Sequence, residues 1–176
     1  MFVLFNEYFF YFFIYSFAGW WLENSFSKVK DGYFFKERFL WGPFKPMYGL
    51  APIILLVLIK PETPIWMMAI LFFLIPTIVE YISGSILDKL FHHKWWDYSE
   101  VSFQLHGHIC LKYSLAWMLL SWIVLTYLHP MVMKSYGLIT PVWQLIIPFI
   151  IVYFITDMLL TIRNRMRQQD LFATTE

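Results

Sequence analysis

Long apolar stretches alternate with short polar, aromatic-rich stretches along this chain. Several apolar stretches approach or exceed the roughly 20 residues that a helix needs to cross a hydrocarbon core about 30 Å thick. The pattern predicts an all-α fold, a polytopic membrane helical bundle of about five transmembrane helices at residues 2–27, 47–60, 64–90, 111–128 and 141–162. Residues 1–176 are expected to form a single transmembrane domain.

Two of the expected spans leave alternatives open. The first could occupy Phe2–Leu22 or Tyr8–Ser27, and the choice decides whether Glu7 or Glu23 lies deeper in the membrane. The second, Met47–Ile59, is short and contains a glycine and a proline. It is therefore compatible with a full crossing or with a broken, re-entrant helix.

Positive charge alternates between successive connections. Short cytoplasmic loops of membrane proteins accumulate lysine and arginine. In this chain the positive residues concentrate after the first span, around the third connection and after the fifth span: Lys28, Lys30, Lys36, Arg38, Lys45, Lys89, Lys94, Lys112, Arg163, Arg165 and Arg167. Only Lys60 and Lys134 lie in the other two connections. The pattern predicts a cell-membrane protein with its N-terminus outside, its C-terminus in the cytoplasm, and two aromatic-rich interfacial loops together on the cytoplasmic face.

The amino-acid composition and the net charge limit the kinds of partner that the protein is expected to have. Hydrophobic residues make up 60% of the chain and charged residues 14%, which indicates contact with membrane lipid. The net charge of +1 argues against nucleic-acid binding, which normally requires a concentrated basic surface. A lone cysteine, Cys110, allows no internal disulfide. We predict no cofactor.

Acidic residues within apolar stretches are the first candidates for function. An ionisable group in a membrane span is costly unless it is paired or hydrated, which singles out Glu80. Arg38, in the other cytoplasmic loop, is a plausible partner, and the alternative is a purely structural clamp between the two. Asp157 lies near the basic end of the last span, where it could be hydrated or paired. Asp88 is expected to be solvated.

The densest set of donors, acceptors and titratable groups lies between residues 95 and 114. Its candidates for catalysis are Asp97, Ser99, His106 and His108. In an enzyme, either histidine could act as general base, the aspartate could orient it, and the serine would be the nucleophile. The alternative is that the histidines hydrogen-bond a folded loop. We predict no metal site, because a structural zinc site usually needs a fourth ligand beyond the His-x-His-x-Cys group.

Several motifs together resemble one bacterial family. They are Phe17-Ala18-Gly19-Trp20-x-x-Glu23, Arg38-Phe39-Leu40-x-Gly42-Pro43-x-x-Pro46-x-Tyr48-Gly49, Glu80-Tyr81, Trp96-Asp97-Tyr98-Ser99 and Gly107-x-x-Cys110. The chain from Phe17 to Ser114 resembles the CmpB family of small multi-pass proteins of the bacterial inner membrane, described as ABC transporter permeases. The resemblance implies a role in transport. At position 106 this chain has histidine where the family pattern has asparagine, which argues against a catalytic His106.

The leading hypothesis is a permease-like protein with a polar, cytoplasm-facing pocket for a substrate, an ion or a partner. The polar positions of the family motifs supply the expected substrate-binding residues: Glu23, Arg38, Glu80, Asp97 and Tyr98. The chain contains no G-x-x-x-x-G-K-[ST] nucleotide loop, so a separate ATPase or other membrane subunit, or a homo-oligomer, is expected. The alternatives are an intramembrane enzyme acting on a lipid or lipid-linked substrate and a structural subunit of a membrane complex.

Overall fold

The computed structural model of the protein describes residues 2–35 and 38–173. In chain order its elements are α1 (Phe2–Asp31), α2 (Pro46–Leu58), α3 (Ile65–Phe91), β1 (Gln104–Leu105), β2 (Ile109–Cys110), α4 (Leu111–Ile123), the π-helical segment η1 (Val124–Leu128) and α5 (His129–Ala173). The two short strands pair in antiparallel register, with Leu105 opposite Ile109. The prediction of an all-α fold is confirmed. Lys36, one of the positive residues named above, lies outside the described residues.

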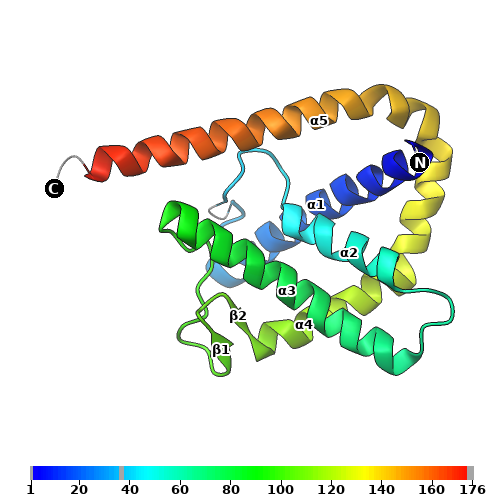
Figure 1. Cartoon of the computed structure of the whole chain (residues 1–176), viewed down its shortest axis with the longest axis horizontal. Coiled ribbons are helices and arrows are strands. Elements are labelled where there is room, and N and C mark those ends of the chain that lie inside the picture. Colours follow the sequence, from blue (N-terminus) through cyan, green and yellow to red (C-terminus); the bar gives the residue numbers. More distant parts are fainter. Residues whose placement is uncertain (1, 36–37, 174–176) are drawn as a thin grey trace.

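The first three helices lie within a few residues of the first three expected spans, whereas the last two spans are joined differently. A connection between two separate spans is expected at residues 128–141, but α4, η1 and α5 follow one another without a break. The chain reverses direction by a bend in the gold part of the ribbon (Figure 1). Helix α5 contains Pro141 and Pro148. Proline removes a helical hydrogen bond and crowds the preceding turn, so it can bend a helix that remains continuous.

Helix length and composition identify two stretches that could cross a membrane. Among the described residues these are Ile65–Phe91 and the continuous helical stretch Leu111–Gln169. The apolar helix α2 has 13 residues. At about 1.5 Å per residue it is about 20 Å long, which is shorter than the hydrocarbon core. By this criterion the described chain has two crossing stretches rather than five.

Helices α1 and α2 approach closely because glycine occupies their contact. A Cβ atom on Gly19 would lie 2.1 Å from Cγ of Tyr48, and one on Gly49 would lie 2.3 Å from Oγ of Ser16. Such distances exclude any larger residue at either position unless the backbone moves. The contact holds the Tyr48 ring directly against α1.

Helices α1 and α5 are joined by an aromatic core. Phe10, Phe13 and Trp143 are buried. The Phe10 and Trp143 rings meet edge to face with their centroids 5.1 Å apart, a favoured geometry for aromatic pairs. The indole Nε1–H of Trp143 donates to the carbonyl of Asn6 at 3.1 Å. This core holds the long α5 along α1.

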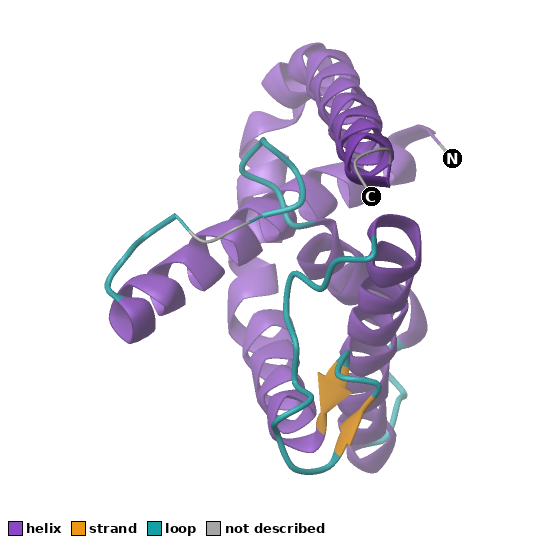
Figure 2. Ribbon diagram, turned by 90° about the vertical axis from the view of Figure 1, so that its left-hand side faces the viewer, coloured by secondary structure: helices purple, strands orange, loops and turns teal. Residues whose placement is uncertain are grey.

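Successive helices run back and forth, so the connections gather at two ends of the molecule. The N-terminus, the α2–α3 connection and the bend of α5 lie on the right in Figure 1, and the hairpin and the C-terminal end of α5 lie on the left. Figure 2 views the molecule from that left side, where the loops and the hairpin face the reader. The segments rich in lysine and arginine therefore share one end.

Candidate functional site

The two aromatic-rich loops contact one another at this end of the molecule. Phe39 in the first loop lies with its ring centroid 5.3 Å from both Phe91 and Trp95. The guanidinium of Arg165, in α5, lies over the Trp95 ring at 5.5 Å, within the range of a cation–π contact. These contacts hold the segment that begins at residue 92 beside the first loop.

A pocket of about 570 Å³ opens beneath the second loop. This volume falls within the roughly 300–1,000 Å³ range of small-molecule sites. Helices α1 to α4 and the second loop all contribute side chains to its walls. The lining residues are Leu22, Glu23, Phe26, Lys30, Met47, Tyr48, Glu80, Trp95, Trp96, Asp97, Tyr98, Val101, Tyr113, Ala116, Trp117 and Leu120.

Glu80 is the most deeply placed acid of the pocket. Its side chain is 2% exposed. Tyr98 donates its hydroxyl to Oε1 at 3.1 Å, and Trp117 donates its indole N–H to Oε2 at 2.9 Å. The Trp117 ring packs against Tyr48 with ring centroids 4.8 Å apart. One carboxylate thus joins α3 to the second loop and to α4 through two neutral donors.

Glu23, the second acid of the pocket, pairs with Lys45 at the end of the first loop. The backbone N–H of Lys45 also donates to the carbonyl of Ser16 at 3.0 Å. Lys45 is therefore tied to α1 by both its main chain and its side chain. This double contact places the start of α2, and with it Tyr48, at the edge of the pocket.

Arg38 lies outside the pocket lining. Its guanidinium is 5.9 Å from the centroid of the Phe35 ring, and its carbonyl accepts a 3.5 Å hydrogen bond from Arg165. The structure thus brings Glu23, Glu80, Asp97 and Tyr98 to one pocket and leaves Arg38 outside it, with its carbonyl in contact with α5. The hydrogen bonds of Glu80 come from Tyr98 and Trp117, so the expected pairing with Arg38 is absent from the described contacts.

Asp157, in α5, binds the main chain of the first loop and so holds this loop against α5. It is 6% exposed. Its carboxylate accepts the backbone N–H groups of Trp41 at 3.1 Å and Gly42 at 2.9 Å. A Cβ on Gly42 would lie 2.9 Å from the Asp157 carboxylate and 2.8 Å from the Tyr153 hydroxyl. The loop is therefore fastened to α5 through the main-chain N–H groups of Trp41 and Gly42, and a side chain at position 42 would crowd this contact.

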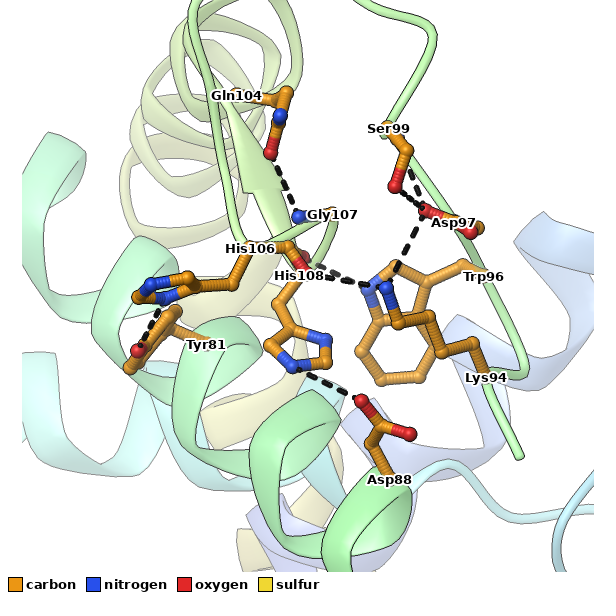
Figure 3. Close-up of polar contacts among 10 residues, drawn as sticks. All are labelled: Tyr81, Asp88, Lys94, Trp96, Asp97, Ser99, Gln104, His106, Gly107 and His108. Carbon is orange, nitrogen blue, oxygen red and sulfur yellow. Dashed lines mark hydrogen bonds and ion pairs between the residues drawn. The ribbon is translucent and has the colours of Figure 1, made fainter. Parts of the chain in front are cut away.

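Asp97 and Ser99 form a local turn at the rim of the pocket. Asp97 Oδ1 accepts both the backbone N–H of Ser99, at 2.9 Å, and its hydroxyl, at 2.6 Å (Figure 3). These hydrogen bonds, with Lys94 nearby, hold the pKa of Asp97 below its usual value. The Ser99 hydroxyl is thus directed at the carboxylate itself, in the manner of an Asx turn.

The two histidines contact different partners on α3. Nδ1 of His106 lies 2.9 Å from the Tyr81 hydroxyl, and Nε2 of His108 lies 3.5 Å from the Asp88 carboxylate (Figure 3). Burial lowers the pKa of His108 below its usual value, although the Asp88 charge acts in the opposite direction. Asp88, expected to be solvated, therefore contacts the hairpin. A histidine–serine hydrogen bond, which nucleophilic catalysis would use, is not among the contacts of the described residues.

Backbone geometry explains the residue type at position 106. His106 has φ 54° and Gly107 has φ 73°, so both adopt the left-handed conformation between the two strands. Tight turns with two such residues favour Asn-Gly. The asparagine that the family pattern implies at this position therefore fits a conformational role. A Cβ on Gly107 would also lie 2.5 Å from Oδ1 of Asp97.

Some site residues carry no clear signal in the sequence. Trp117 is one of many aromatic residues in an apolar stretch, and only the fold brings it to Glu80. Tyr48 belongs to a family motif, yet its neighbours suggest only a turn. In the described part of the chain, no three His, Cys, Asp or Glu side chains converge on a position that could hold a metal ion.

The fold and the pocket define an all-helical protein with two helical stretches long and apolar enough to cross a membrane. The family model described as "Putative ABC-transporter type IV" matches residues 10–162, so the chain belongs to this family. The match confirms the resemblance drawn from the motifs. No curated protein and no solved structure shows a significant match to the chain.

Proposed function

We propose that this protein is a multi-pass, permease-type subunit of a bacterial cytoplasmic membrane that binds its substrate in the pocket above Glu80. Membership of an ABC-transporter-type family supports a role in transport. The observation that carries the proposal is the buried Glu80 carboxylate at a pocket of about 570 Å³. Glu23, Asp97 and Tyr98 line the same pocket and are proposed to contact the substrate, whereas Arg38 is proposed to act from outside it.

The outer surface of α3 supports a membrane location. Apolar residues recur at every fourth position along the helix, each between 43% and 50% exposed: Ile70, Leu74, Ile78, Ile82 and Ile86. Residues four apart lie on one face of a helix, so these side chains form a continuous apolar ridge. Soluble proteins rarely expose such a surface, whereas lipid would cover it.

The arrangement of the helices supports five crossings with the N-terminus outside. The helices alternate in direction, and the segments rich in lysine and arginine lie at the same end (Figure 1). The positive-inside rule assigns that end to the cytoplasm. On a Cys110→Ala background, we expect Lys134→Cys to react with a membrane-impermeant maleimide in intact spheroplasts and Lys30→Cys to react only after lysis. The reverse labelling would overturn this orientation.

An ATPase partner would have to be a separate chain. The sequence contains no phosphate-binding G-x-x-x-x-G-K-[ST] loop, which ATP hydrolysis by the usual route requires. We therefore propose that the protein works as a homo-oligomer or with another membrane subunit. Gentle extraction followed by native mass spectrometry should show a retained second subunit or a second copy. A bare monomer that still moves substrate would contradict this part of the proposal.

Filling the pocket tests its role in transport. Ala116 lines the pocket, so Ala116→Trp places an indole inside it. Ala69 is exposed on α3 and is not among the lining residues, so Ala69→Trp is the matched control. Metabolites that differ in amount between cells with and without the protein should lose that difference in Ala116→Trp and keep it in Ala69→Trp. Equal retention in both variants, at equal expression, would contradict a substrate site in this pocket.

A further inference from the structure

The charge balance around Glu80 is incomplete. Among the described residues, the polar contacts of its carboxylate are the neutral Tyr98 hydroxyl and Trp117 indole N–H. Glu23, another acid in the pocket lining, is itself paired with Lys45. A buried charge without an opposite charge is costly. The group that enters this pocket can therefore supply the missing positive charge.

The walls of the pocket give a second and independent indication that its ligand is a cation. They carry the aromatic rings of Tyr48, Trp95, Trp96, Tyr113 and Trp117. Aromatic faces attract organic cations, which lose less hydration on binding than small metal ions or ammonium groups do. The pocket also has an apolar margin, formed by Leu22 and Phe26 on α1 and by Leu120 on α4. An apolar group attached to the cation would be buried against this margin.

We propose that the pocket binds an amphiphilic organic cation, with its positive centre beside Glu80 and its apolar part between α1 and α4. This assignment rests on the proposed function, since it names the class of substrate for the same pocket. A small inorganic cation would leave most of the volume and the aromatic walls unused. The lining has three carboxylates, Glu23, Glu80 and Asp97, and one lysine, Lys30, so its balance of charge disfavours an organic anion.

Two ions of nearly the same shape and opposite charge test the proposal. Tetraphenylphosphonium and tetraphenylborate differ chiefly in the sign of their charge. The purified full-length protein in lipid nanodiscs should bind tetraphenylphosphonium saturably above the level of empty nanodiscs, and tetraphenylborate should not displace it. Equilibrium dialysis measures both, and empty nanodiscs correct for partition into lipid.

Matched acid-to-amide variants locate the charge. Glu80→Gln should weaken tetraphenylphosphonium binding by about tenfold or more, because it removes the charge at the cation's position. Glu62→Gln changes an exposed acid in the α2–α3 connection and should leave binding unchanged. Unchanged binding in Glu80→Gln would overturn the proposal.

The remaining outcomes separate this proposal from the proposed function. If both ions bind and Ala116→Trp abolishes the binding of both, the pocket is a binding site but the proposed preference for cations is wrong. If no saturable binding occurs, the cation proposal also falls, while the metabolite comparison of Ala116→Trp and Ala69→Trp still decides the proposed function. If that comparison also shows no difference, both proposals fail.

Discussion

Asp157 and Glu80 are two buried carboxylates that receive hydrogen bonds from neutral donors in very different surroundings. Asp157 meets two backbone N–H groups and packs against Gly42 so tightly that a Cβ atom there would lie 2.9 Å from its oxygen. Glu80 meets two side-chain donors beside a pocket of about 570 Å³. One acid is covered by the protein's own backbone, and the other faces space that a ligand can fill.

This difference distinguishes a structural acid from a candidate binding acid. The backbone N–H groups of Trp41 and Gly42 lose this acceptor if Asp157 is replaced, so we expect Asp157 to support the fold itself. The Tyr98 hydroxyl and the Trp117 indole are side-chain groups beside the pocket, where water can replace a lost partner. Changes at the Asp157 clamp should therefore act on stability, and changes at Glu80 should act on binding.

The largest expected loss of stability is that of Asp157→Ala. It leaves two backbone N–H groups without an acceptor, which should cost about 2–5 kcal/mol of unfolding free energy. Thermal unfolding followed by tryptophan fluorescence in detergent measures the effect. Asp157→Asn keeps one carbonyl oxygen and should lose less, and the exposed Glu62→Ala should lose almost nothing. If the Asp157→Ala protein is as stable as the wild type, Asp157 does not have the structural role proposed for it.

The second largest loss of stability is expected for Gly42→Ala. Its unfolding free energy should fall by about 1–3 kcal/mol, because the added methyl group overpacks the contact with Asp157 and Tyr153. Gly137→Ala is the matched control. A Cβ on Gly137 meets no atom within 4 Å, and alanine is the better helix former, so its stability should stay equal or rise. The same thermal unfolding assay applies, and equal effects at both glycines would contradict the tight clamp.

Tyr98→Phe should lower the unfolding free energy by a smaller amount, about 0.5–1.5 kcal/mol, because it removes one hydrogen bond to Glu80 and keeps the ring in place. Burial and the Glu80 charge raise the pKa of Tyr98, so the wild-type hydroxyl stays protonated, and able to donate, in alkaline solution. Tyr33→Phe removes an exposed hydroxyl and serves as the control. A difference between the two variants that disappears by pH 9 would contradict the hydrogen bond.

Glu80→Gln should change stability least, by under about 1 kcal/mol in either direction. The amide oxygen still accepts one hydrogen bond, and a buried amide costs less than a buried carboxylate. Its large effect should appear in ligand binding instead. If Glu80→Gln destabilises the protein as strongly as Asp157→Ala, the two acids have the same structural role and the comparison fails.

The residue pattern alone predicts much of the fold. The bounds of α1, α2 and α3 lie within a few residues of the expected spans because apolar runs and flanking polar residues mark helices locally. The connection between residues 128 and 141 is helical instead, and a helix that contains proline, as α5 does, can bend without a break. The five crossings and the orientation stay predictions, because both depend on a membrane around the chain.

The pocket shows where prediction from sequence ends. Glu23, Glu80, Asp97 and Tyr98 are found from polar motif positions within an apolar chain, and all four line the pocket. Arg38 matches the same motifs but lies elsewhere, because the distant Asp157 fastens its loop to α5. Trp117 contacts Glu80 from 37 positions along the chain, and no local pattern marks it out among the other aromatic residues.

The sequence by itself determined the helical class, the approximate helix bounds, the family and the acidic and aromatic residues on which the proposed site depends. These properties follow from local periodicity and from residues that cannot lie cheaply in an apolar environment. The tertiary structure decided which buried acid faces a cavity and which is covered by backbone. That outcome depends on contacts between residues far apart in the chain, such as Gly42 with Asp157 and Glu80 with Trp117, which only the packed helices bring within hydrogen-bonding distance.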